Sequence, residues 1–198
     1  MDDAAWVADY VTKSAAAVEA FAADGAARAA LLAMAEAIGA ALRGGGKLLT
    51  AGNGGSAGDA QHIAGEFVVR LMYDRAPLAA MALTTDGSVM TAAGNDYGFE
   101  RAFERQVRAL GRPGDALLAI STSGNSPNIL RALEAARAGG LATLGFGAGG
   151  GGAMAGLCEH LFLAPTVETA LAQQIHIIAA HIVCGLVERA FFPREPAP

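Results

Sequence analysis

Short unbroken apolar runs alternate along the chain with longer segments in which apolar residues recur at helical spacing. The runs predict five strands, over 47–51, 78–83, 116–121, 142–146 and 160–164. The longer segments predict helices over 57–72, 88–93, 98–110, 127–138 and 169–190. Strands that alternate with helices pair in parallel and are covered on both faces. The pattern therefore predicts an α/β fold, a three-layer αβα sandwich around a five-stranded parallel sheet whose strands are buried on both sides.

Residues 1–45 precede this alternation and are expected to form an N-terminal helical segment. Residues 2–43 are rich in alanine, and their apolar positions predict two helices broken near Asp24 and Gly25. The length of 198 residues suits a single domain, 1–198, with a substantial core. We expect residues 193–198 to be a loose tail and the glycines at 149–152 to form a flexible connection from a strand to a helix.

Composition narrows the class of protein. Hydrophobic residues make up 53% and charged residues 17% of the chain, as in a globular protein. The formal net charge of −5, without a basic cluster, argues against nucleic acid as a partner. The mean hydropathy of +0.36 predicts apolar surface buried between subunits. The two cysteines are widely spaced, which fits a reducing compartment, and the N-terminus is acidic, unlike a signal peptide. The longest apolar run, 177–187, is too short for a membrane span. We therefore expect a cytoplasmic protein without a membrane partner.

A glycine-rich loop between a predicted strand and a predicted helix is the most informative local feature. Gly52, Gly54 and Gly55 let the backbone turn tightly and approach a ligand, and the N–H groups that open the helix suit a phosphate or hydroxyl oxygen. His62 and Glu66 follow on one face of that helix. Each feature alone has a simpler explanation, an ordinary turn or a solvated His–Glu pair. Together they favour a site that acts on a phosphorylated small molecule.

Two further segments follow predicted strands, at the edge where open α/β sheets bind ligands. Residues 84–86 follow the second strand, and residues 94–97 come after a short helix. Residues 121–126 carry four hydroxyl groups and open another helix. Neutral donors at a helix N-terminus can hold a phosphate. An ordinary N-cap needs only one hydroxyl, so the sequence favours phosphate binding over simple capping.

The last predicted helix carries Gln173, His176 and His181. Gln173 and His181, placed together with His62 and Glu66, would offer four nitrogen and oxygen ligands to a divalent metal such as zinc. Spacing alone does not establish this site, because a histidine on an apolar helix is more often a hydrogen-bonded core residue. Both alternatives stay open on this evidence.

At these motifs the chain resembles the phosphoheptose isomerases, which are built on the sugar-isomerase (SIS) fold, a flavodoxin-like αβα sandwich. The resemblance spans nearly the whole chain. It is carried by Gly52-Asn53-Gly54-Gly55-Ser56, Asp59-Ala60-Gln61-His62 with Glu66, Gly94-Asn95-Asp96-Tyr97-Gly98, Gly114-Asp115, Ile120-Ser121-Thr122-Ser123-Gly124-Asn125-Ser126, and Gln173-x-x-His176 with His181.

The resemblance implies a role for each matching position. Glu66 and His181 would transfer protons, and one Zn²⁺ per subunit would be bound by His62, Glu66, Gln173 and His181. The substrate contacts would be Asn53, Gly54, Gly55, Ser56, Glu66, Asn95, Asp96, Ser121, Thr122, Ser123, Ser126 and Gln173. The assembly would be a homotetramer whose active sites combine residues from neighbouring subunits.

The implied reaction converts the ketose sedoheptulose 7-phosphate into the aldose D-glycero-D-manno-heptose 7-phosphate through an enediol, for heptose and lipopolysaccharide synthesis. Glu66 would be the base and His181 the acid. The alternative is a non-catalytic SIS protein that binds a sugar phosphate or the replication initiator protein. A relative of that kind has Asn at the position of His181, so His181 favours the enzyme. Leu171 and Gln174 depart from the usual Arg and Glu of the family.

Overall fold

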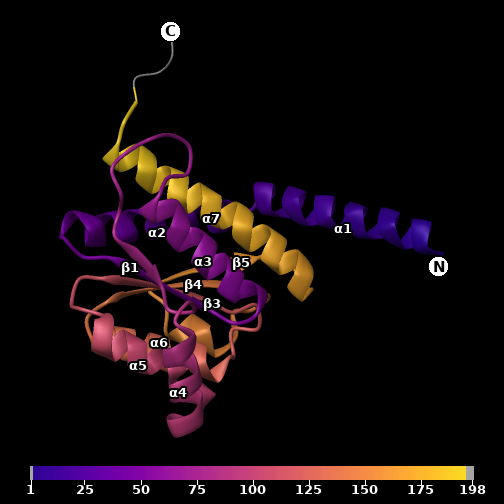
Figure 1. Cartoon of the computed structure of the whole chain (residues 1–198). Helices are drawn as coiled ribbons and strands as arrows, with labels where there is room; N and C mark the ends of the chain where they lie inside the picture. The colour runs from indigo at the N-terminus through magenta and orange to yellow at the C-terminus, as the bar shows by residue number, and fades with distance from the viewer. Residues whose placement is uncertain (1, 195–198) are drawn as a thin grey trace.

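The computed structural model describes residues 2–194 and contains one parallel sheet (Figure 1). Its five strands stand in the order β2-β1-β3-β4-β5. They are β1 (Leu48–Gly52), β2 (Ala80–Ala82), β3 (Ala116–Ile120), β4 (Ala142–Ala148) and β5 (His160–Ala164). The predicted fold class is confirmed, with the chain order reversing between β1 and β3 at the middle of the sheet.

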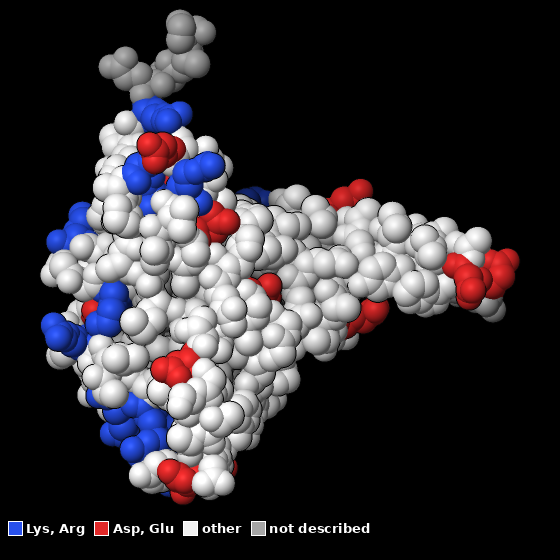
Figure 2. All heavy atoms as spheres, in the orientation of Figure 1, with Lys and Arg blue, Asp and Glu red and all other residues white. Residues whose placement is uncertain are grey.

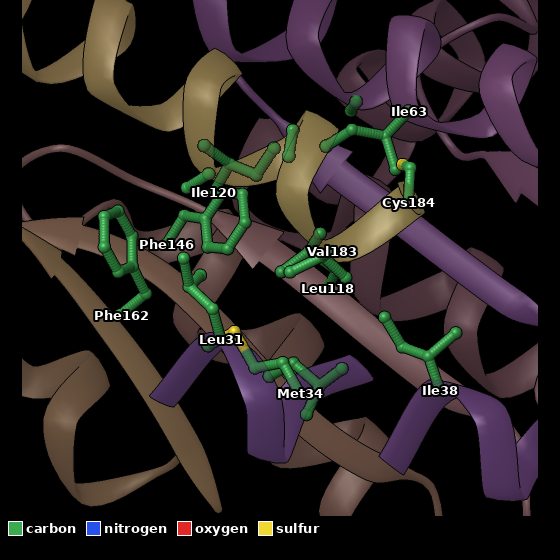
Figure 3. Packing of buried hydrophobic residues seen from close by; sticks show 14 of the residues in the cluster. Leu31, Met34, Ile38, Ile63, Leu118, Ile120, Phe146, Phe162, Val183 and Cys184 are labelled. Carbon is green, nitrogen blue, oxygen red and sulfur yellow. The ribbon is translucent and has the colours of Figure 1, made fainter. Parts of the chain in front are cut away.

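Helices cover both faces of the sheet (Figure 1). They are α1 (Asp3–Ala23), α2 (Gly25–Arg43), α3 (Gly55–Val68), α4 (Gly87–Tyr97), α5 (Ala102–Leu110), α6 (Pro127–Ala138) and α7 (Thr169–Phe191), with short 3₁₀ helices η1 (Phe99–Arg101) and η2 (Gly152–Gly156). Side chains of β3 alternate between the two cores: Leu118 joins the core under α2, α3 and α7, whereas Leu117 joins the core over α5 and α6. Figure 3 shows the first core, with Val183 of α7 beside Leu118.

Not every predicted strand is buried on both sides, which corrects the expectation from the apolar runs. β2 is only three residues long and lies at the sheet edge, and Met81 in it is 44% exposed. An edge strand pairs with only one neighbouring strand and leaves its other side open, so an apolar run there does not imply full burial.

Several helix bounds also differ from the predicted ones. α3 ends at Val68 instead of residue 72, and α4 continues through the segment 94–97 that was expected to follow a helix. Gly98, with φ of 85°, ends α4, and the chain makes a 3₁₀ turn before α5 begins at Ala102. Asn95 and Asp96 therefore lie in the last turn of a helix.

The N-terminal helix projects from the body as an arm (Figures 1 and 2). Asp24 ends α1 and caps α2 by accepting hydrogen bonds from the N–H groups of Ala26 and Ala27, so the predicted break is confirmed. Only Ala17 and Phe21 of α1 are buried. Figure 2 shows mostly uncharged atoms along the arm and acidic groups at its tip. Within the described residues, the outer part of the arm has little to pack against.

Two helices, α2 and α7, are long and apolar enough to span a membrane by length and composition alone. The full length of α7, 23 residues, exceeds the apolar run on which the sequence argument relied. Its position explains its composition, because α7 lies on the sheet between α2 and α3 and over half of its most apolar window is buried in the fold. Of the tail predicted at 193–198, residues 195–198 lie outside the described residues.

Candidate active site

The two loops with phosphate-binding character lie side by side because β1 and β3 are paired. Gly52 is opposite Ile120 at the carboxyl ends of these strands. Across the two loops, the side-chain amides of Asn53 and Asn128 exchange two hydrogen bonds, of 2.9 and 2.8 Å. Asn128 is buried in the first turn of α6. The sequence analysis missed this residue, since nothing local distinguishes it from any polar residue after Pro127.

The serine loop, residues 121–126, gathers three hydroxyl groups at the start of α6. The Oγ of Ser121 lies 3.0 Å from Oγ of Ser126 and 3.4 Å from Oγ of Ser123. Ser126 occupies the N-cap position, yet its side chain makes no capping hydrogen bond. The hydroxyls therefore face one another instead of the helix N–H groups. This geometry leaves the three hydroxyl groups, together with the positive end of the α6 dipole, available to an anion. A phosphate site is expected to have this arrangement.

The glycine run at 149–152 packs against the serine loop. Gly124 has a φ of 64° and lies so close to Gly151 that a side chain at Gly124 would collide with the Gly151 carbonyl. The Asn125 side chain accepts from the N–H of Ala153 (2.9 Å) and donates to the carbonyl of Ser123 (3.0 Å). The glycine run forms a packed turn that leads into η2, and its backbone contacts the serine loop at Gly124.

A second group of polar side chains lies between α3 and α7. His62 Nε2 lies 3.1 Å from Oε1 of Glu66 and 3.0 Å from Nε2 of His181. The ligand atoms of these three residues all lie within 4.8 Å of one another. His62 and His181 are exposed and Glu66 is half-buried, so the cluster opens to solvent. One imidazole must donate to the other, so the pair can hold and pass a proton.

Gln173, the fourth predicted metal ligand, lies against Gly55 at the start of α3. A Cβ on Gly55 would come within 2.6 Å of Nε2 of Gln173, so a side chain at Gly55 would displace this amide. Gln173 is two turns before His181 on α7, about 12 Å along the helix axis. The structure therefore assembles three of the four predicted ligands, and the place of Gln173 in the set stays a prediction.

The other polar residues of the predicted motifs have separate environments. Asn95 and Asp96 bond to each other (2.7 Å) on α4, and Asp96 lines a cavity of about 680 Å³ with Val89 and Arg105. Their contact with the substrate stays a prediction. Leu171 and Gln174, which stand where the family usually has Arg and Glu, both have packing roles. Leu171 is buried, and Gln174 donates to the Tyr10 hydroxyl of α1 at 3.2 Å.

His176 is a hydrogen-bonded core residue, as is common for a histidine on an apolar helix. Its Nε2 lies 2.8 Å from the carbonyl oxygen of Gly147, and its ring packs beside the rings of Phe146 and Phe162. Burial lowers the pKa of His176, and its bond to Gly147 only partly opposes this. The imidazole is therefore neutral and donates through Nε2.

Asp59 lies one turn before His62 on α3, with its Oδ2 buried and without a hydrogen-bond partner among the described residues. Burial raises the pKa of Asp59, and the neighbouring His62 partly lowers it. Its spacing from His62 places it on the same side of the helix, next to the His–Glu–His cluster.

A family model of the SIS domain matches residues 9–148. The fold and the paired loops thus define a sugar-isomerase domain. The phosphoheptose isomerase of Nitratidesulfovibrio vulgaris is 58% identical over 146 residues, 74% of this chain and 70% of that protein. The phosphoheptose isomerase of Bradyrhizobium sp. (strain ORS 278) is 54% identical over 184 residues, 93% of each. This chain belongs to the phosphoheptose isomerase family.

Solved structures of the same family have the same fold. The phosphoheptose isomerase from Neisseria gonorrhoeae superposes with a TM-score of 0.85 at 40% identity, covering 91% of this chain and 97% of that one. The enzyme from Francisella tularensis gives a TM-score of 0.90 at 34% identity, covering 96% and 100%.

Proposed function

We propose that this chain is a ketose–aldose isomerase that converts sedoheptulose 7-phosphate into D-glycero-D-manno-heptose 7-phosphate, a precursor for heptose and lipopolysaccharide synthesis. The observation that carries the proposal is the His62–Glu66–His181 cluster, with Nε2 of His62 within 3.1 Å of both partners. Membership of the phosphoheptose isomerase family supports the choice of substrate.

The reaction requires a proton to leave C1 and another to arrive at C2. The Glu66 carboxylate takes the C1 proton, which gives an enediolate, and then returns a proton to C2. His181 donates a proton to O2 and accepts the one that leaves O1, so the hydroxyl protons balance. A positioned acid or base contributes typically about 10²–10⁴-fold to such a step.

The serine loop holds the phosphate in this proposal. Ser121, Thr122, Ser123 and Ser126 donate hydroxyl hydrogen bonds at the N-terminus of α6. The remaining substrate contacts are Asn53, Gly54, Gly55, Ser56, Glu66, Asn95, Asp96 and Gln173. In this proposal the extended heptose chain reaches from the serine loop, which holds its phosphate, to the acid–base cluster, which acts on C1 and C2.

A divalent metal, Zn²⁺, is the proposed cofactor, bound by His62, Glu66, Gln173 and His181. Two imidazole nitrogens and a carboxylate oxygen are ligands that zinc prefers, and their mutual separation below 4.8 Å supports the fit. When bound, the metal polarises the sugar carbonyl and stabilises charge on the enediolate oxygen. Binding lowers the basicity of Glu66, so the proposal requires this carboxylate to be weakly bound or released during turnover.

The proposed assembly is a cytoplasmic homotetramer with interfaces made by α1, α2 and α7. Trp6 and Val11 on the projecting arm are 58% and 62% exposed, which is surface that a second copy would cover. Both cysteines are unpaired, which fits a reducing compartment. Light scattering at micromolar concentration tests the assembly, and a monomer there contradicts it.

Turnover of sedoheptulose 7-phosphate by the purified protein, with and without a chelator, tests the proposed function. We expect conversion to the aldose phosphate. Binding of the sugar phosphate without turnover would instead favour the non-catalytic alternative.

A further inference from the structure

The end of α3 that carries Glu66 is held by a buried guanidinium. The side chain of Arg75 is only 3% exposed. Its Nη2 donates to the carbonyl of Glu66 (2.6 Å) and its Nη1 to the carbonyl of Phe67 (2.7 Å). These carbonyls belong to the last turn of α3, which has no intrahelical donors of its own to satisfy them. Arg75 therefore caps α3 at the residue proposed as the base.

The same guanidinium pairs with a carboxylate on α7. Nε of Arg75 lies 3.0 Å from Oε1 of Glu188, whose side chain is 1% exposed. Glu188 also accepts from the N–H groups of Leu71 (3.0 Å) and Met72 (2.9 Å). Burial alone would raise the pKa of Glu188, but these donors and Arg75 outweigh it and hold the pKa below its usual range. Glu188 is therefore ionised, and both of its oxygens accept hydrogen bonds.

Glu188 and His181 lie on one face of α7, because seven residues make almost two helical turns. Their helix packs alongside α3, so the network joins the helix that bears the proposed acid to the end of the helix that bears the proposed base. His181, whose ring lies beside His62 and Glu66, is about two turns before Glu188 on α7. The distance between His181 and Glu66 thus depends on the packing of α3 against α7.

Stability by itself does not explain a buried ion pair at this position. Replacing such a pair by apolar residues of similar volume is often neutral or stabilising. An apolar pair would keep the helices in contact, but it could not donate to two carbonyls at the end of α3. The ion pair adds directional hydrogen bonds, because the N–H groups of the planar guanidinium point at fixed angles to one another.

We propose that Arg75 and Glu188 are positioning residues for the isomerisation: they fix the last turn of α3 on α7 and so hold Glu66 beside His62 and His181. This inference rests on the roles proposed above for Glu66 and His181. The serine loop is held separately, by the Asn53–Asn128 bonds and the glycine run. Loss of the network is therefore expected to affect the chemical step and not phosphate binding.

Two variants test the proposal. Arg75→Lys keeps a cation but cannot donate to both carbonyls and to Glu188. The double variant Arg75→Met with Glu188→Leu removes both charges, which avoids an unpaired buried charge and favours a folded protein. For each we expect kcat to fall by roughly 10²-fold, the loss typical of a catalytic group displaced by about 1 Å, while KM stays within about twofold.

The matched control is Lys47→Met. Lys47 pairs with the buried Asp115 at 2.5 Å, and the two residues directly precede β1 and β3, at the edge of the sheet opposite the two substrate loops. The control breaks a second, partly buried ion pair and leaves the Asp115 carboxylate without its cation, so any general cost in stability appears as a change in its melting temperature. We expect its kcat to match that of the wild-type protein.

A second readout is Co²⁺ binding, followed by its visible absorption. We expect weaker binding and an altered spectrum in the Arg75 variants and neither change in the control, because the ligand cluster depends on α3 and α7 being correctly seated. A folded double variant with wild-type kcat and an unchanged Co²⁺ spectrum would overturn the proposal, as would a rise in KM equal to the fall in kcat. Absence of turnover by the wild-type protein would instead refute the proposed function, and Co²⁺ binding would still test the positioning role.

Discussion

Asn53 and Asn128 face each other across the carboxyl ends of β1 and β3 and exchange two amide hydrogen bonds, of 2.9 and 2.8 Å. The pair joins the glycine loop to the first turn of α6. Each amide supplies one donor and one acceptor to the other, and their remaining donors and acceptors stay free. The two loops proposed to bind substrate are therefore held at a fixed separation before any ligand arrives, which lowers the ordering cost of binding.

Asn128→Ala is expected to destabilise the protein and raise KM. The change leaves the buried side of the Asn53 amide without a partner, which costs about 1–3 kcal/mol. Urea denaturation measures the free energy of unfolding, and steady-state kinetics measure KM. In a double-mutant cycle with Asn53→Ala, the two effects should be strongly non-additive. Simple additivity would show that the two amides act independently.

Glu66→Gln is expected to lower kcat by at least about 10²-fold while leaving the fold intact. A carboxamide fills the same volume but cannot accept the proton from carbon. Glu134→Gln, on the exposed side of α6, is the matched control and should retain wild-type activity. A near-normal kcat in Glu66→Gln would remove Glu66 from the role of base.

Ser123→Ala is expected to raise KM for the phosphorylated substrate roughly 10- to 150-fold, the equivalent of about 1.5–3 kcal/mol for a hydrogen bond to a charged group. The control is Ser14→Ala, because the Ser14 hydroxyl donates only to the carbonyl of Tyr10 within α1. Sedoheptulose without phosphate should be a poor substrate for the wild-type protein. Equal rates with both sugars would contradict a phosphate site at the serine loop.

The stability of the protein should decrease as the pH falls through about 6.5, partly because of His176. Burial lowers its pKa below the ordinary 6.5 of the unfolded chain. The unfolded state therefore binds more protons in the pH range below 6.5, which favours unfolding there and has no effect at higher pH. Urea denaturation at about pH 8 and about pH 5.5 measures the difference. His176→Gln should make the difference smaller, and an unchanged pH dependence in this variant would exclude His176 as its cause.

Protein purified without a chelator is expected to contain about one zinc per chain by elemental analysis. Chelation should remove both metal and activity, and added Zn²⁺ should restore them. His62→Ala should lose the metal, whereas His176→Gln should retain it, because His176 bonds to Gly147 in the core. Full activity in a chelator, with no metal near stoichiometry, would leave the cluster as acid, base and substrate contacts only.

Much of this molecule could be predicted from local sequence. The alternation of apolar runs and helical segments was sufficient for the parallel sheet, because buried strands and amphipathic helices differ in period. The break near Asp24 and Gly25 followed from the interruption of the helical pattern there. The placement of His62 and Glu66 on one face followed from a four-residue spacing. Each of these depends on residues within one or two turns of one another.

Other features were decided only by the tertiary structure, because they join residues far apart in the chain. His62 and His181 are 119 positions apart, and Arg75 and Glu188 are 113 apart. No local pattern specifies how α3 is seated on α7, since many registers would bury similar apolar area. The edge position of β2, which exposes Met81, likewise depends on strand order and not on the run itself. The sequence thus determined the helices and strands through its periodicity, and the chemical groups that they carry through its residue types. Long-range packing determined which side chains meet, because it selects one register among many of similar hydrophobicity.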